Sequence, residues 1–143
     1  MKISTRGRYA IRVMLDLAEH NNGEYIPLMD IAKRQEISEK YLEAIVAALS
    51  KNGFVRAQRG KGGGYKLIKA PADYSIGSIL KVTEGSLAPV ACLEGEVNTC
   101  ERVDTCKTLK MWKDFHKLVQ DYFDKISLQD LIGNSEDVGN YVI

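Results

Sequence analysis

The strongest restriction on the fold of this chain is a pair of short helix patterns followed at once by a glycine-rich hairpin pattern. Pro27 can open the first helix, Leu28 to Gln35, because proline suits the first helical turn. Ser38 can cap the second helix, which runs from Glu39 to about Lys51. One face of this second helix is apolar at helical spacing and consists of Leu42, Ile45, Val46 and Leu49. Two such helices joined by a tight turn predict a helix-turn-helix unit.

The hairpin pattern follows directly. Residues 54–58 and 65–68 are rich in strand-forming residues, and the turn between them, Arg59 to Gly64, contains four glycines. We therefore expect a β-hairpin wing, in a fold that is otherwise mostly α-helical. Glycines let backbone N–H groups approach phosphates, and an arginine at such a tip can enter a narrow minor groove. Protein binding by a winged helix stays open, whereas nucleotide binding is disfavoured because the turn lacks the Lys-Ser/Thr ending of a phosphate loop.

The outer face of the second helix and the hairpin tip form the candidate DNA-binding surface. A recognition helix meets base edges near its N-terminus, which here carries Ser38, Lys40, Tyr41 and Glu43. The hairpin tip adds Arg59, Lys61, Gly62 and Gly63. Arg8 and Arg12 can contact phosphates or simply solvate the first helix of the chain. Glu43 repels phosphate. Three roles stay open for it: it accepts a hydrogen bond from a cytosine amine, it disfavours binding to incorrect DNA sequences, or it is simply a solvated glutamate.

Charge is distributed unevenly along the chain. Residues 1–70 carry 13 Lys and Arg against 7 Asp and Glu, whereas residues 71–143 carry 7 against 12, so the whole chain is only +1. This distribution is consistent with a first half that contacts DNA and a second half that has a different role. The sequence has no apolar run of membrane-spanning length and no signal peptide at its start, so we expect a cytoplasmic protein.

The second half of the chain is expected to extend the DNA-binding unit of residues 1–70. Ser75 can cap a connector helix from Ile76 to about Glu84, and a long amphipathic helix spans about 107–126. The apolar stripe of the long helix consists of Leu109, Trp112, Phe115, His116, Val119 and Phe123. Ser127 can cap a last short helix, Leu128 to Ile132, before a polar C-terminal tail.

All three cysteines lie in one irregular segment, about 90–107, between the connector and the long helix. Cys92, Cys100 and Cys106 have the spacing C-x7-C-x5-C, and an odd number of cysteines makes a poor disulfide framework. Flexible loops let several thiolates converge on one iron–sulfur cluster. The segment also contains four acidic residues, which argues against burial of the loop without a ligand. A zinc site, a metal-free thiol switch and three small buried hydrophobic residues are the alternatives.

The combined motifs resemble the Rrf-type family of bacterial winged-helix regulators over nearly the whole chain. The resemblance is carried by residues 1–10 (MKISTRGRYA), 38–43 (SEKYLE), 55–60 (VRAQRG) and 63–65 (GGY). It implies a homodimer in which the long helix crosses its twin, with the helix from Ser38 in the major groove and Arg59 in the minor groove. IscR-like, NsrR-like and RirA-like members place three cluster-binding cysteines at similar positions. IscR-like members carry an amide at position 44, and Ala44 puts the operator sequence in doubt.

The resemblance leaves the fourth cluster ligand open. IscR-like members have a histidine three residues after the third cysteine, where this chain has Leu109. NsrR-like members use an acid of the partner's first helix, where this chain has Arg8. His116 is about 15 Å beyond Cys106 along a helix, so we expect it to be packed or at an interface. Asp104, Glu101, water or a small thiol can complete the site, and the choice between 2Fe–2S and 4Fe–4S stays open.

The sequence as a whole predicts a homodimeric transcription regulator controlled by an iron–sulfur cluster that reports iron, cluster supply, oxygen or nitric oxide. The alternative is a CymR-like regulator, controlled by a partner protein or by thiol oxidation without a cluster. An enzyme is not expected, because no nucleophile and base are paired and the only histidines are His20 and His116. Stabilisation of the end of the first helix accounts for His20.

Overall fold

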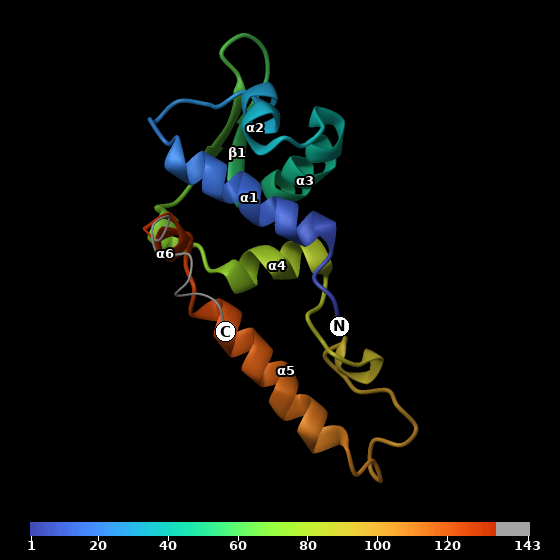
Figure 1. The fold of residues 1–143 in the computed structure, drawn as a ribbon. Coiled ribbons are helices and arrows are strands. Elements are labelled where there is room, and N and C mark those ends of the chain that lie inside the picture. Colours follow the sequence, from blue (N-terminus) through green and yellow to red (C-terminus); the bar gives the residue numbers. More distant parts are fainter. Residues whose placement is uncertain (134–143) are drawn as a thin grey trace.

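The computed structural model describes residues 1–133, and the predicted polar tail from residue 134 lies outside them. The expected fold class is confirmed: the described chain is mostly helical, with one two-stranded antiparallel hairpin (Figure 1). Its elements, in order, are α1 (Thr5–Glu19), α2 (Leu28–Gln35), α3 (Glu39–Lys51), β1 (Val55–Gln58), β2 (Gly64–Leu67), η1 (Pro71–Asp73), α4 (Ile76–Glu84), η2 (Ala91–Leu93), α5 (Leu109–Asp124) and α6 (Leu128–Ile132).

Serine caps set the start of four helices. In each case the side-chain oxygen accepts a hydrogen bond from the backbone N–H three residues later, at 3.0 to 3.2 Å. The four caps are Ser4, Ser38, Ser75 and Ser127, and the last three are the caps predicted above. Each satisfies a backbone donor that the helix itself leaves unpaired, an effect of about 1 kcal/mol.

The hairpin pairs Val55 with Leu67 and Gln58 with Gly64, and a third segment joins it. Ile26 exchanges two backbone hydrogen bonds with Tyr65, at 2.8 and 2.9 Å, just before α2 begins. The close approach requires glycine next to Tyr65. Gly64 has φ +146°, and a Cβ there would lie 2.1 Å from the carbonyl oxygen of Ile26. The wing is therefore tied directly to the start of the helix-turn-helix.

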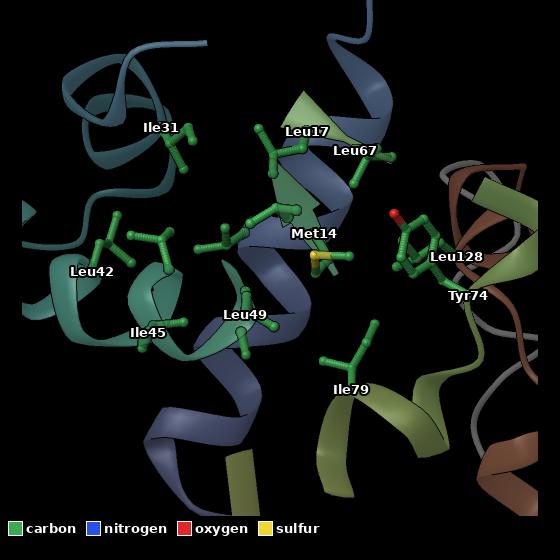
Figure 2. Close-up of a cluster of buried hydrophobic side chains, with 14 of the residues drawn as sticks. Met14, Leu17, Ile31, Leu42, Ile45, Leu49, Leu67, Tyr74, Ile79 and Leu128 are labelled. Atoms are coloured by element: carbon green, nitrogen blue, oxygen red, sulfur yellow. The ribbon is translucent and has the colours of Figure 1, made fainter. Parts of the chain in front are cut away.

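One hydrophobic core joins the helices, with α1 at its centre (Figure 2). Met14 and Leu17 of α1 are almost completely buried against side chains from α2, α3, α4 and α6. The predicted inner face of α3 is confirmed, because Leu42, Ile45, Val46 and Leu49 are all buried. Leu128 of α6 is fully buried in the same core. The second half of the chain therefore packs against the DNA-binding unit of residues 1–70. Burial of each such side chain contributes about 1.5 to 3 kcal/mol.

Helix α5 leaves this helical body and points away from α1 and the wing (Figure 1). None of its residues is buried. Trp112, His116, Val119 and Phe123 of the predicted stripe are half-buried, but Phe115 is exposed. A second row of apolar side chains is exposed to solvent and consists of Met111, Phe115, Leu118 and Tyr122. The apolar surface of this helix is thus wider than the sequence predicts.

Within residues 1–133, no helix has both the length and the apolar character that crossing a bilayer requires.

Candidate DNA-binding surface and cysteine loop

The turn between α2 and α3 has the geometry of a helix-turn-helix. Glu36 ends α2 in the left-handed conformation, with φ +56° and ψ +44°. Ile37 follows and is buried, which fixes the angle at which the chain enters α3. The candidate residues at the N-terminus of α3 are all exposed: Ser38, Lys40, Tyr41 and Glu43. A recognition surface therefore stands outward on a helix whose other face is held in the core.

The wing tip is a glycine turn that carries two exposed cations, Arg59 and Lys61. Gly60 and Gly62 have φ values of +87° and +77°, which side chains other than glycine rarely adopt. Gly63 donates its N–H to the carbonyl of Gly60 at 3.0 Å, and a Cβ at Gly63 would lie 2.3 Å from the carbonyl oxygen of Gln58. The tip is therefore compact, and its backbone can approach a nucleic acid closely.

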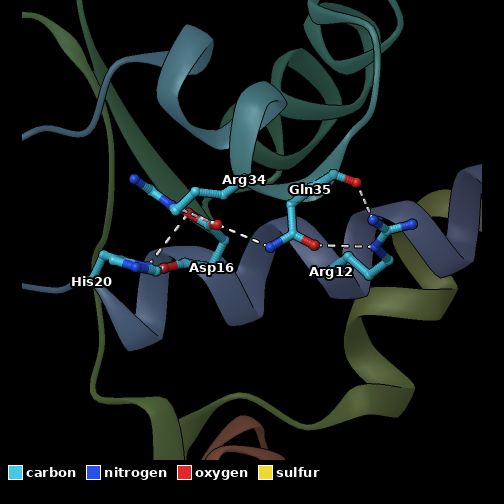
Figure 3. Close-up of polar contacts among 5 residues, drawn as sticks. All are labelled: Arg12, Asp16, His20, Arg34 and Gln35. Atoms are coloured by element: carbon cyan, nitrogen blue, oxygen red, sulfur yellow. Dashed lines mark hydrogen bonds and ion pairs between the residues drawn. The ribbon is translucent and has the colours of Figure 1, made fainter.

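A buried carboxylate fastens α1 to α2 behind this surface (Figure 3). A charged residue on a surface helix is expected to face solvent, but Asp16 of α1 is only 1% exposed. Arg34 donates two hydrogen bonds to its carboxylate, at 3.0 and 2.7 Å, and the Gln35 amide donates a third at 2.9 Å. These bonds with Asp16 raise the pKa of Arg34 above its usual value. A buried charge requires such partners, since it has lost its water.

Arg12 extends this network along α1 and is engaged within the protein (Figure 3). Its guanidinium donates one hydrogen bond to the side-chain oxygen of Gln35, at 3.1 Å, and another to the Gln35 backbone carbonyl. It also lies 5.2 Å from the ring centre of Tyr9, which packs edge-on against Tyr41 at 5.6 Å. Arg8, by contrast, is exposed, and its guanidinium donates to the Thr5 hydroxyl at 3.1 Å. Phosphate contacts by either arginine stay predictions.

His20 lies at the end of α1, where the sequence expects it to stabilise the helix terminus. Its Nδ1 is 2.9 Å from the backbone carbonyl oxygen of Asp16 and 3.7 Å from the Asp16 carboxylate. The imidazole thus contacts both the helix end and the buried network.

The cysteine loop connects α4 to α5 at the edge of the body (Figure 1). All three thiols are free. Cys92 is half-buried, whereas Cys100 and Cys106 are exposed. Hydrogen bonds with the side chain and then the backbone of Thr108 lower the pKa of the Cys106 thiol. Among residues 1–133, no three His, Cys, Asp or Glu side chains are close enough together to hold a metal ion. The loop therefore carries three free cysteines, but it does not bring their sulfur atoms together at one point.

The candidate fourth ligands lie apart as well. Glu101 and Asp104 are exposed on the loop. His116 points its Nδ1 into the protein, where this atom is buried and has no hydrogen-bond partner in the described part of the chain. It lines a cavity of about 560 Å³ that is also bordered by Lys81, Glu94 and Glu96. The half-buried His116 agrees with the expected packed or interfacial role.

The profile of the Rrf2 family, described as "Iron-dependent Transcriptional regulator", matches residues 3–134. The chain belongs to the Rrf2 family. It is 37% identical over 136 residues to the HTH-type transcriptional regulator IscR of Pectobacterium carotovorum, a match that covers 95% of this chain and 82% of the relative.

Two solved Rrf2-type structures are similar along their whole length. CymR of B. subtilis, a global cysteine regulator, matches with a TM-score of 0.75 at 32% identity and covers 94% of this chain and 98% of its own. IscR of T. potens matches with a TM-score of 0.74 at 33% identity, and the match covers 100% of this chain and 93% of the IscR chain. This Rrf2 chain is thus a DNA-binding transcription regulator, and its relatives are regulators rather than enzymes.

Proposed function

We propose that this Rrf2 regulator works as a homodimer whose affinity for DNA is set by an iron–sulfur cluster on Cys92, Cys100 and Cys106. One observation carries the proposal. All three cysteines of the chain are free and lie in a single loop, between the DNA-binding body and the exposed helix α5. The family's description as iron-dependent supports this assignment.

The donor set fits a cluster in chemistry and in access. Thiolates are the ligands that iron–sulfur clusters prefer. Two of the three thiols face solvent, and Thr108 favours the thiolate form of Cys106. The cluster would supply a group whose presence or oxidation state changes with iron, oxygen or nitric oxide. The loop has to close when its ligands bind, and the binding itself supplies the free energy for that ordering. Glu101, Asp104 or an exogenous ligand completes the site.

The dimer is supported by the unpartnered face of α5. Met111, Leu118 and Tyr122 are 39 to 67% exposed on a helix that has no buried residue. Apolar side chains in such a row are typical of a helix that packs against a second helix. A second copy of this chain is the occupant that we propose, because helix-turn-helix regulators bind two half-sites as two-fold symmetric dimers. A change in the cysteine loop, which leads directly into α5, would then alter the spacing of the two recognition helices.

On DNA, the N-terminus of α3 is assigned to the major groove and Arg59 to the adjacent minor groove. Helix α3 presents Lys40, Tyr41 and Glu43 outward, and the wing presents its cationic tip. We place the protein in the cytoplasm, where its DNA target lies.

The test is anaerobic reconstitution with iron and sulfide, followed by an absorption spectrum and analysis of both elements. We expect a coloured protein with bound iron and sulfide, and no colour when all three cysteines are replaced by serine. A Thr99→Ser variant in the same loop is the matched control. DNA affinity of the loaded and the metal-free protein must differ, since otherwise no signal passes. A colourless protein after reconstitution contradicts the proposal.

The second candidate function is control by thiol oxidation without a cluster. The exposed Cys106, whose pKa is lowered, favours it, as does the structural likeness to CymR. In that case hydrogen peroxide changes the DNA affinity of the metal-free protein, and Cys106→Ser removes the response. An unchanged affinity after peroxide treatment excludes this function.

A further inference from the structure

A groove lies on the DNA-facing side of the body, between the N-terminus of α1 and the first turns of α3. It has a volume of about 510 Å³. The residues that line it come from these two helices and are Arg6, Ser38, Lys40, Tyr41, Ala44 and Ile45. Ala44 is exposed in the groove, whereas Ile45 below it is almost completely buried. The DNA contacts assigned so far do not include Ala44, which stands where IscR-like members carry an amide.

The groove is held in shape before any ligand arrives. The Tyr41 ring packs edge-on against Tyr9 of α1, with 5.6 Å between the ring centres. Tyr9 in turn stacks with Arg12, which is hydrogen-bonded to Gln35 at the end of α2. The backbone N–H of Tyr41 donates to Ser38 at 3.0 Å. The aromatic wall therefore needs no rearrangement, which reduces the entropic cost of binding.

Arg6, Ser38, Lys40 and Tyr41 give the groove polar walls, whereas Ala44 and Ile45 form an apolar part between them. Ala44 and Ile45 have no polar side-chain atom, so neither can pair with the donors and acceptors of guanine, cytosine or adenine. The C5-methyl of thymine is the apolar group that the major groove of DNA displays. Arg6 and Lys40 are exposed at the same groove and carry the positive charge that attracts the flanking phosphates.

We propose that this groove receives the C5-methyl group of a thymine in each operator half-site, and that Ala44 is the residue that determines this specificity. Ala44 lies one helical turn after Tyr41, so both side chains face the same strip of DNA. The inference rests on the assignment of α3 to the major groove. Contact with a single methyl group changes affinity by about fourfold, which corresponds to roughly 0.8 kcal/mol per buried carbon.

The experiment starts from operator sequences that the purified wild-type dimer selects from a pool of random duplexes. Each thymine of the selected half-site is then replaced by deoxyuridine, which removes only the methyl group. Fluorescence anisotropy measures the affinity. We expect one position per half-site at which deoxyuridine weakens binding about fourfold, and about fifteenfold when both half-sites are changed.

Two substitutions assign the effect to Ala44. Ala44→Gly removes the side chain that contacts the methyl, so the preference for thymine over uracil at that position should fall toward one. Ala44→Gln introduces an amide that pairs with adenine, so selection with this variant should replace the thymine. Ala47→Gly is the matched control, because Ala47 is exposed on the same helix outside the groove. It loses the same helix propensity and should keep the thymine preference.

The outcomes separate this inference from the function on which it rests. If no sequence is selected at all, DNA recognition by α3 fails and the thymine contact fails with it. If a sequence is selected but no deoxyuridine weakens binding, the thymine contact alone is wrong. The same holds if Ala44→Gly keeps the full preference for thymine.

Discussion

The hydroxyl group of Tyr74 donates a hydrogen bond to the backbone carbonyl of Phe54, at 2.7 Å, and so joins the start of the wing to the segment before α4. The same oxygen accepts the backbone N–H groups of Ile68 and Lys69, both at 3.0 Å. Tyr74 is 2% exposed, so its hydroxyl group makes these hydrogen bonds in a buried position. One side chain thereby fixes both ends of the hairpin.

The first prediction concerns this hydroxyl. Tyr74→Phe keeps the buried ring but leaves three backbone groups without their partner, so the free energy of unfolding should fall by about 1 to 3 kcal/mol. Urea unfolding followed by circular dichroism measures the loss. Tyr41→Phe, at an exposed tyrosine of α3, is the control and should change stability little. Equal stability of the two variants would show that the wing does not depend on Tyr74.

The second prediction concerns the buried carboxylate of Asp16. Asp16→Asn keeps the size of the side chain but removes the charge that pairs with Arg34, which is itself only about one-third exposed. We expect a loss of about 1 to 3 kcal/mol in the free energy of unfolding, because the pair is desolvated on one side only. Glu19→Gln removes an exposed charge from the same helix and should change stability by less than about 0.5 kcal/mol. A loss no larger than that of the control contradicts the role assigned to Asp16.

The helices and the wing were predictable because their signals are local. The cap at Ser38 and the apolar face from Leu42 to Leu49 lie within one helix, and the glycine turn lies within one hairpin. The partners of Asp16 are 18 and 19 residues away, and Tyr74 reaches back 20 residues to Phe54. Helical periodicity carries no information on such pairs, so a charged residue is assigned to solvent by default.

The candidate site was predictable in composition but not in conformation. The spacing of Cys92, Cys100 and Cys106 predicts the donors, and the structure places these cysteines in one loop without bringing them together. Glu101 and Asp104 are exposed on this loop, and its side chains bury little apolar surface. Nothing in the protein itself therefore favours the gathered form, and the free energy has to come from the ligand.

The third prediction concerns a contact between residues 80 positions apart, which the sequence pattern also did not predict. Glu84, the last residue of α4, accepts hydrogen bonds from the backbone N–H and the hydroxyl of Ser4, at 2.9 and 2.7 Å. Gly7 leaves room for this carboxylate, because a Cβ at Gly7 would lie 2.1 Å from it. Alanine normally stabilises a helix by about 1 kcal/mol relative to glycine. Here we expect Gly7→Ala to destabilise the protein instead, because the Glu84 side chain can move away from the new Cβ only by giving up both hydrogen bonds with Ser4.

A double-mutant cycle tests the cause. In a Glu84→Ala background the carboxylate is gone, so Gly7→Ala should cost much less than it does in the wild type, measured by urea unfolding. Equal costs in the two backgrounds would mean that Glu84 is not what requires glycine at position 7. Because Glu84 directly precedes the cysteine loop, the same contact ties the start of α1 to that loop.

The fourth prediction concerns the dimer. Leu118 is 67% exposed in the apolar row of α5 and lies outside the core. Leu118→Glu should shift the protein from dimer to monomer in analytical ultracentrifugation, because it places a charge in the proposed interface and opposite its own copy. Lys113→Glu changes charge at an exposed polar position of the same helix and should leave the dimer intact. A dimeric Leu118→Glu variant contradicts the proposed interface.

The last prediction concerns the wing tip on DNA. Arg59 is exposed at the glycine turn, and within residues 1–133 no hydrogen bond or ion pair of its side chain holds it to the body, so its removal should not affect folding. Arg59→Ala should weaken operator binding by about 1 to 3 kcal/mol per half-site and lower the salt slope of log K by about one unit per protomer. Titrations by anisotropy at several salt concentrations measure both quantities. Lys125→Ala, directly after the C-terminal end of α5, loses the same charge and should change neither. If Arg59 contacts phosphates, the variant must release fewer counterions from the DNA when it binds. An unchanged salt slope for Arg59→Ala would therefore show that the wing is not part of the DNA interface.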